Sequence, residues 1–406
     1  MIPTLPLALP LLSFLLTPVP TLAPQVVTGS SALGPRVAVQ PARLWTVSSV
    51  PGQGDFATIQ DAVDASTSGD AILVLAGGIG PYPGFTIAGK GTSVFGEASF
   101  TLDGPVLVRD VPAGASVVLR GFTMQIFTGS GASLSSPMLE VRNCGGPVWI
   151  EDCGIWYDVE GAPFVVEDAE SVILARCNAI SASQGPLAHA TLTAERSSVF
   201  AYATDFRGEN NTTYQLPAGS AASIVDSYFY AAGCSFVGGS LFGQAQLGFS
   251  APGSGLFANA GSEVQALDCF FAAGGGGILT AEDFVGPVTQ LPGDARDLSV
   301  DPIARSGAPL TISGQAEFFD RLELIRATAA QVGVYLQQHL GIQLVAPPYD
   351  FEDLGTLPPT TFYSRTATTP PLHPLRPFQV FYYQGLFFDR DGFAFLSSPS
   401  ATLRIP

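Results

Sequence analysis

A short motif recurs through the middle of the chain. Each copy has an apolar or β-branched run, one polar or small residue, and then Cys, Thr or Phe at a matching place; Ser171–Ile180 (SVILARCNAI) is the clearest copy. Successive matching places lie 31, 24, 27, 30 and 35 residues apart. One such unit cannot bury its apolar face alone, so the spacing predicts repeats that stack on one another. The matching places are Phe122, Cys153, Cys177, Thr204, Cys234 and Cys269.

The composition favours β-strands as the building blocks of the repeat. Of the 406 residues 47% are hydrophobic and 13% are charged, with 45 Gly and 33 Pro, which is typical of a turn-rich all-β protein. Each repeat carries two apolar runs separated by a short turn. This pattern predicts coils that each contain two or three parallel strands. The longer gaps predict loops at Arg207–Ser220 and Gly238–Gly255, and such loops commonly hold binding sites.

A short helix is predicted just before the repeats. Asp55 is the expected N-cap, and Ile59, Ala62 and Val63 form an apolar stripe at helical spacing. The helix should end near Ser66–Gly69, and a continuous apolar strand should follow it.

This opening segment resembles the start of secreted right-handed parallel β-helix proteins of the pectin-lyase-like superfamily. The likeness rests on GDFATIQDAVDA, residues 54–65, and on GDAILV, residues 69–74. In that family the first motif is a helix that caps the solenoid and the second motif begins the first coil. A cap is needed because the first coil has an open edge and an apolar interior. The resemblance implies a right-handed parallel β-helix with an N-terminal capping helix over residues 44–293.

The last quarter of the chain predicts a different module. Residues 294–309 lack periodicity and are interpreted as a linker. Residues 378–398 (FQVFYYQGLFFDRDGFAFLSS) predict two long strands around an Asp-Gly turn. YYQGLFFD, residues 382–389, resembles part of a small C-terminal β-domain of exported planctomycete-type bacterial proteins. The resemblance implies a β-sandwich-like domain over residues 310–406.

One part of this module fits two structures. Apolar residues between Phe318 and Leu336 are spaced as in a helix. The resemblance instead implies a strand at Arg321–Thr328 and a second at Ile342–Val345. We favour the strands.

The N-terminal residues predict export. Residues 2–23 are apolar and uncharged, which indicates a signal peptide of residues 1–23 followed by a linker of residues 24–43. Four prolines within this stretch disfavour a spanning helix. We expect a secreted or cell-envelope protein with no membrane span once the leader is removed.

The acidic charge limits the partners. The net charge is −17 and Lys90 is the only lysine, whereas nucleic-acid binding needs clustered basic residues. An anionic polysaccharide would be repelled unless Ca²⁺ bridged the two, and Ca²⁺ is the one cofactor left open. An acidic surface that only keeps a monomer soluble explains the same charge.

The five cysteines lack CxxC spacing, which argues against a zinc site. Four of them fall at the matching place, where stacking coils would bring neighbouring thiols toward disulfide distance. Because Thr204 and Phe122 fill the same place, we expect buried free thiols. Disulfides between coils are the alternative.

Catalytic signatures are absent from the sequence. The resemblance would imply lyases, polygalacturonases or esterases, but the N-T-D, D-D and G-H-G patterns of polygalacturonases and the Q-D-T pattern of esterases do not occur. His189, His339 and His373 lie in unrelated segments and give no support to a Ser-His-Asp arrangement.

Two acidic groups are weak candidate sites. Asp205, Arg207 and Glu209 alternate, so a strand would point them to one face, where they could serve as acid and base or hold Ca²⁺ and a sugar acid. A solvated charge ladder is the simpler interpretation. Asp389 and Asp391 suggest a calcium loop, but a hairpin turn is favoured because further acidic ligands are missing.

Aromatic residues in the repeats offer a third kind of site. Side chains that face outward on one wall of the solenoid would form a platform on which sugars stack. Core packing explains each one equally well. The weak candidates for glycan binding are Trp149, Trp156, Tyr157, Tyr228 and Tyr230.

Three functions follow from the sequence. The leading hypothesis is an exported, non-catalytic solenoid that presents a surface for glycan or cell-surface binding. The alternative is a polysaccharide lyase or glycoside hydrolase with a carboxylate cluster assembled across coils, because such a cluster leaves no linear motif. A purely structural surface spacer is the third.

Overall fold

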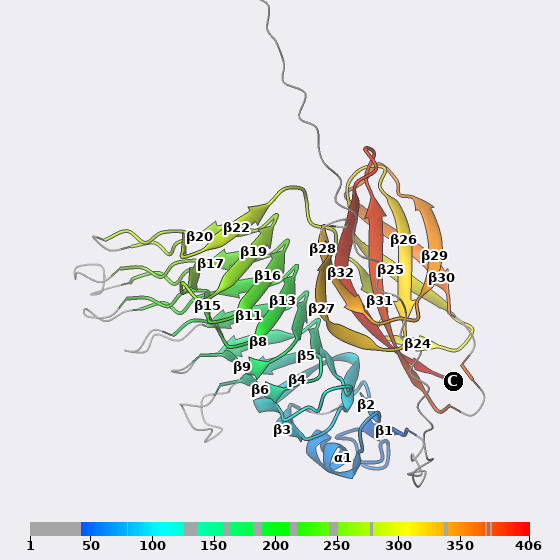
Figure 1. The fold of residues 1–406 in the computed structure, drawn as a ribbon. Helices are drawn as coiled ribbons and strands as arrows, with labels where there is room; N and C mark the ends of the chain where they lie inside the picture. Colours follow the sequence, from blue (N-terminus) through cyan, green and yellow to red (C-terminus); the bar gives the residue numbers. More distant parts are fainter. Residues whose placement is uncertain are drawn as a thin grey trace, which may run out of the picture. The chain divides into compact units, whose positions relative to one another are not determined.

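The computed structural model describes residues 42–78, 80–125, 137–157, 162–181, 189–211, 217–242, 251–276, 279–336, 340–369, 372–373 and 376–406 (Figure 1). The predicted leader, and the linker up to residue 41, lie outside this range. Within it the fold is all-β with a single helix, and a 22-stranded sheet accompanies sheets of five, three and two strands.

The first elements close one end of the solenoid. They are β1 (Leu44–Val47), α1 (Ile59–Ala65) and β2 (Ala71–Val74). The predicted apolar stripe of α1 is buried, which confirms the capping helix. The predicted N-cap was wrong: Thr58 caps the helix by accepting from the Asp61 amide. The Asp55 carboxylate instead accepts hydrogen bonds from the Thr46 amide and hydroxyl at 2.8 Å, because the chain has not yet turned into the helix.

The coils form a parallel β-helix with three columns of strands, and each strand pairs with its counterpart in the next coil. Early strands β3 (Tyr82–Ala88), β4 (Ser93–Arg109) and β5 (Val117–Gln125) begin the stack. The first column then holds β6 (Leu139–Cys144), β9 (Phe164–Ala169), β12 (Leu192–Glu195), β15 (Ala222–Val225), β18 (Leu256–Ala258) and β21 (Phe284–Val285). The second holds β7 (Val148–Glu151), β10 (Val172–Ala175), β13 (Ser198–Tyr202), β16 (Tyr228–Ala232), β19 (Glu263–Leu267) and β22 (Val288–Leu291). The third holds β8 (Gly154–Tyr157), β11 (Asn178–Ser181), β14 (Asp205–Arg207), β17 (Ser235–Val237) and β20 (Phe270–Ala272).

Left-handed residues make the turns between columns. In most of these turns one residue has a positive φ, which Gly, Asn and Asp adopt most readily. This requirement explains the polar or small residue of the repeated motif. The turn between the first and second columns uses Asp110, Asn143, Asp168, Arg196 and Asp226, and the turn between the second and third uses Gly121, Asp152, Arg176, Ala203, Gly233 and Asp268.

The residue at the matching place of the motif follows the turn between the second and third columns, and its side chain points inward. Strand register stacks its six residues in consecutive coils, as the repeat predicts. The Cys153 thiol donates to the carbonyl of Glu151 at 3.1 Å, and the Thr204 hydroxyl donates to that of Tyr202 at 2.9 Å. A short donor thus satisfies the turn carbonyl two residues earlier, which explains why Cys and Thr interchange. All five cysteines are free thiols.

The C-terminal part forms β-sandwich-like sheets. Its strands are β23 (Ser299–Val300), β24 (Ile303–Arg305), β25 (Pro309–Gln315), β26 (Arg321–Ala327), β27 (Ala330–Leu336), β28 (Gly341–Val345), β29 (Asp350–Thr356), β30 (Phe362–Thr368), β31 (Gln379–Phe388) and β32 (Ala394–Ile405). The strands predicted at Arg321–Thr328 and Ile342–Val345 are confirmed by β26 and β28. The loop expected between them was wrong, because β27 forms there and pairs with β28 as a hairpin. Two short strands, β23 and β24, fall within residues 294–309.

The C-terminal sheets cover the outward face of the second column. We call this face the covered wall: its apolar residues are buried in one cluster with side chains of β26, β28, β31 and β32. The Trp149 and Tyr382 rings, for example, lie with centroids 5.1 Å apart. The covered wall consists of Leu73, Phe95, Val118, Trp149, Ile173, Phe200 and Tyr230.

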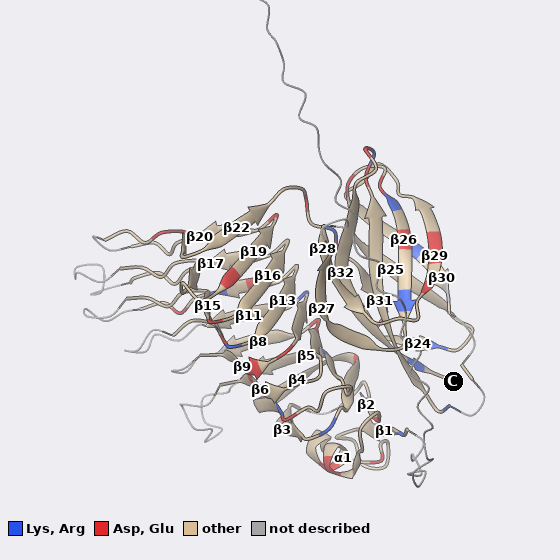
Figure 2. Cartoon of the chain, in the orientation of Figure 1, with Lys and Arg blue, Asp and Glu red and all other residues tan. Residues whose placement is uncertain are grey.

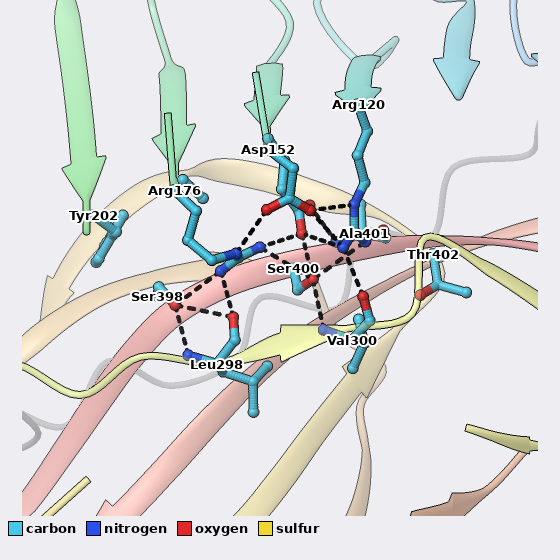
Figure 3. Close-up of polar contacts among 12 residues, drawn as sticks. Arg120, Asp152, Arg176, Tyr202, Leu298, Val300, Ser398, Ser400, Ala401 and Thr402 are labelled. Carbon is cyan, nitrogen blue, oxygen red and sulfur yellow. Dashed lines mark hydrogen bonds and ion pairs between the residues drawn. The ribbon is translucent and has the colours of Figure 1, made fainter. Parts of the chain in front are cut away.

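A polar network holds the edge of this interface (Figure 3). Glu151 is fully buried, accepts from the Ala401 amide at 2.7 Å and pairs with Arg120 at 3.1 Å and with Arg176. Burial raises the pKa of Glu151, although both guanidinium groups oppose the shift. Arg176 also donates to the Leu298 carbonyl at 2.5 Å. The network therefore ties three successive coils to β32.

Candidate functional site

The outward face of the third column is the solenoid surface that best fits a binding site. Side chains there alternate with buried ones: Asp205 and Arg207 are exposed while Phe206 between them is buried. Most strands of the solenoid carry no charge (Figure 2), so these two residues stand out on the third column. We call this face the open wall, and its outward residues are Trp156, Asn178, Ile180, Asp205, Arg207, Ser235 and Phe270.

Trp156 provides the aromatic surface of the open wall. Its side chain is 51% exposed. Its neighbour in the same strand is Gly154, and a Cβ placed on this glycine would lie 3.5 Å from the indole Nε1. The ring therefore lies alongside bare backbone. Strand register places Trp156 beside Ile180, and Ile180 beside Arg207 in the next coil.

Asp205 and Arg207 supply polar groups on the same wall, two coils along from this ring. Register places Asp205 between Asn178 and Ser235 of the neighbouring coils. Within the part of the chain that the structure describes, neither the carboxylate nor the guanidinium has an ion-pair partner. Both are free to contact a ligand.

Glu209 does not join them. Strand β14 ends at Arg207, and Glu209 is fully buried, where its carboxylate accepts from the His189 amide at 2.9 Å. Alternation places Asp205 and Arg207 on one face, but it stops applying once the strand ends.

The other aromatic candidates lie elsewhere. Trp149 and Tyr230 are fully buried under the C-terminal sheets. Tyr228 is half-buried and donates to Gln265 Oε1 at 3.2 Å. The side chain of Tyr157 lies outside the described structure. Among the candidates whose side chains are described, Trp156 is the only exposed one, and Tyr228 is partly accessible.

The open wall leads at its far end to a cavity of about 250 Å³, which we call the junction pocket. Ser235 and Phe270 of the wall line it together with Asp268, Arg296 and Gln315. Phe270 is 60% exposed, whereas the Arg296 guanidinium is engaged by Asp320 at 2.5 Å. Neither Gln315 nor Arg296 belongs to the repeats, so no repeat pattern could have indicated this pocket.

A second, more open cavity of about 490 Å³ lies along the turn between the first and second columns. Part of its charge is already matched, since Arg196 binds Asp168 at 2.7 Å and Glu167 at 2.6 Å, whereas Glu170 and Asp226, which also line it, form no ion pair among the described residues. The hydrogen bond from Arg196 lowers the pKa of Asp168. A ligand would have to compete with these pairs, so this groove is the weaker candidate.

The described residues offer few groups for acid–base catalysis or for metal binding. The open wall has one carboxylate, Asp205, and glycoside hydrolysis needs two. No group of three or more His, Cys, Asp or Glu in the described ranges is placed to hold a metal ion. The Asp389 carboxylate accepts from the amides of Asp391 and Phe393 at 2.9 and 2.8 Å, which makes it a turn-forming residue of the β31–β32 hairpin.

The thiols are poor nucleophiles. Burial raises the pKa of Cys153 and of Cys234 well above the ordinary value, so little thiolate forms at neutral pH. Their contacts with turn carbonyls assign them a packing role.

No family model matches the chain, and no curated protein matches it significantly. Across the residues that the structure describes, none of the helices is long and apolar enough to cross a membrane.

Proposed function

We propose that this is an exported, non-catalytic protein that binds a glycan on its open wall. The observation that carries the proposal is Trp156, a residue that is 51% exposed and whose ring lies beside the bare backbone of Gly154. Sugar rings have an apolar face that packs on such an aromatic surface. The resemblance of residues 54–74 to secreted pectin-lyase-like proteins and the apolar N-terminus favour export and a carbohydrate ligand.

Polar groups two coils further along the same wall suit sugar hydroxyls. The Asp205 carboxylate accepts hydrogen bonds and the Arg207 guanidinium donates them. The wall thus combines one stacking surface with acceptors and a donor, the mixture found in small-molecule sites.

Replacement of Trp156 tests the proposal. The chain has three tryptophans, Trp45, Trp149 and Trp156, so glycan binding should change the fluorescence of an exposed one. We expect Trp156→Ala to lower the affinity for a bound glycan about tenfold or more, as loss of an aromatic contact does. Phe257→Ala removes an exposed ring (40%) from β18 in another column and serves as the matched control.

A glycan array followed by calorimetry on purified protein, with and without Ca²⁺, makes the measurement. Binding that Trp156→Ala and Phe257→Ala weaken equally would rule out the open wall. Release of reducing ends or unsaturated products from any glycan that binds, abolished by Asp205→Asn, would establish an enzyme instead. Absence of binding to every glycan would leave the surface-spacer hypothesis.

A further inference from the structure

We propose that the ligand is an extended, uncharged polysaccharide chain that lies along the solenoid axis and places one end in the junction pocket. This inference rests on the proposed function, and it adds the direction, the length and the chemical class of the ligand. It also gives the C-terminal part a role in binding, since Gln315 lines the pocket.

The spacing of the coils fits an extended glycan. Trp156 on β8 is separated from Phe270 on β20 by four coil steps through β11, β14 and β17. With about 4.8 Å between neighbouring strands, these steps span ~19 Å. Each step is close to the length of one pyranose residue in an extended chain. The two exposed rings therefore lie where sugars about four residues apart would stack.

Strand register arranges the outward residues between the two rings in two adjacent rows. Asn178, Asp205, Ser235 and Phe270 occupy one row in successive coils, and Trp156, Ile180 and Arg207 occupy the next row, which continues through Val237 and Ala272. The two rings therefore lie in neighbouring rows at opposite ends of the path. A glycan that ran parallel to the strands would leave these rows within one or two sugars. A chain along the axis meets one outward pair of residues in every coil.

The junction pocket provides an end to this path. The cavity of about 250 Å³ suits a single sugar unit and is lined by Phe270, Ser235 and Gln315 among others. Phe270 offers a ring, the Ser235 hydroxyl and the Gln315 amide both donate and accept hydrogen bonds, and Asp268 accepts them. The Arg296 guanidinium is neutralised by Asp320, so the pocket lacks a free cation among its described residues.

The charges along the path decide against an acidic glycan. Asp205 and Asp268 are exposed carboxylates, and Arg207 is the one unpaired cation of the open wall as described. A chain of uronic acids would meet more negative than positive charge on a protein whose net charge is −17. Uncharged sugars use the same hydrogen-bonding groups without this repulsion.

A series of oligosaccharides of increasing length tests the inference. We would titrate the purified protein by calorimetry with β-1,4-linked glucose and N-acetylglucosamine oligomers of two to six residues, and with galacturonate oligomers of the same lengths. Affinity for one neutral series should rise up to about five residues, since that length reaches from Trp156 to Phe270. Phe270→Ala should weaken the pentamer about tenfold and leave the dimer unchanged.

Gln315→Ala should act on the longer oligomers in the same way, and Phe257→Ala should act on none. A neutral series whose affinity levels off at two residues, or a Phe270→Ala variant that matches Phe257→Ala, would overturn the inference while glycan binding itself stands. Tighter binding of the galacturonate series would overturn the assignment to uncharged sugars. If no oligomer of any kind binds, both the inference and the proposed function fail.

Discussion

Two walls of the same solenoid, built from the same coils, have opposite chemistry. The covered wall presents Val118, Trp149, Ile173 and other large apolar residues, and all are buried by the C-terminal sheets. The open wall presents Trp156, Asp205 and Arg207 to solvent. The backbone in the two columns is equivalent, so the outward side chains alone decide which wall is covered. A repeat fixes the stack, and each outward row is then free to acquire a separate role.

The two tryptophans Trp149 and Trp156 give the sharpest test of this contrast and the largest expected effect. Trp149→Ala should lower the free energy of unfolding by about 3–5 kcal/mol, because it removes a fully buried ring that packs on Tyr382. Trp156→Ala should change it by less than about 0.5 kcal/mol, because the ring is exposed. Urea denaturation of both variants checks the difference, and equal losses would contradict the assignment of the two walls.

Glu151 tests the polar edge of the covered wall and should have the next largest effect. Glu151→Gln removes the fully buried one of the two carboxylates that Arg120 and Arg176 share and leaves only Asp152, so we expect a loss of about 3 kcal/mol in the free energy of unfolding. Glu195→Gln is the matched control, since that carboxylate forms an exposed pair with Arg196 and should matter little. Denaturant unfolding at neutral pH measures both. If the two substitutions had the same small effect, the network would not hold the interface.

The inward matching place is common to both walls, and changes there should have the smallest effect. Cys177→Thr should cost less than about 1.5 kcal/mol, because Thr204 fills the same place one coil away and donates to the equivalent carbonyl. Cys177→Ala should cost more than Cys177→Thr, because it leaves the Ala175 carbonyl without the thiol donor. Thermal unfolding would compare the two, and the reverse order would show that the hydrogen bond is irrelevant.

Much of the solenoid could be predicted from the sequence because its constraints are local. The matching place stacks in register as the 24-to-35-residue spacing indicates, and the buried stripe of α1 follows helical spacing. The N-cap was missed because Asp55 and Thr58 are both good capping residues, and only the path of the chain decides between them. The strands of the C-terminal part were partly foreseen, but the β27–β28 hairpin was not.

The candidate site was less predictable because it depends on contacts between distant segments. Alternation shows that Trp149 and Trp156 both point outward, but it does not show that β31 covers one of them. Glu209 had the right spacing from Asp205, yet the strand ends two residues earlier. The junction pocket joins Phe270 to Gln315 from a different sheet, and no sequence pattern connects them.

The interface has a consequence for how the protein is made. Glu151 is held by the amide of Ala401, which lies 250 residues later. A ribosome finishes the coils well before it supplies β32, so the apolar wall stays uncovered until that strand has been made. During that interval the nascent protein exposes apolar surface, which is prone to aggregation. A frameshift or nonsense codon between the coils and β32 would therefore yield an aggregation-prone product although every coil is intact.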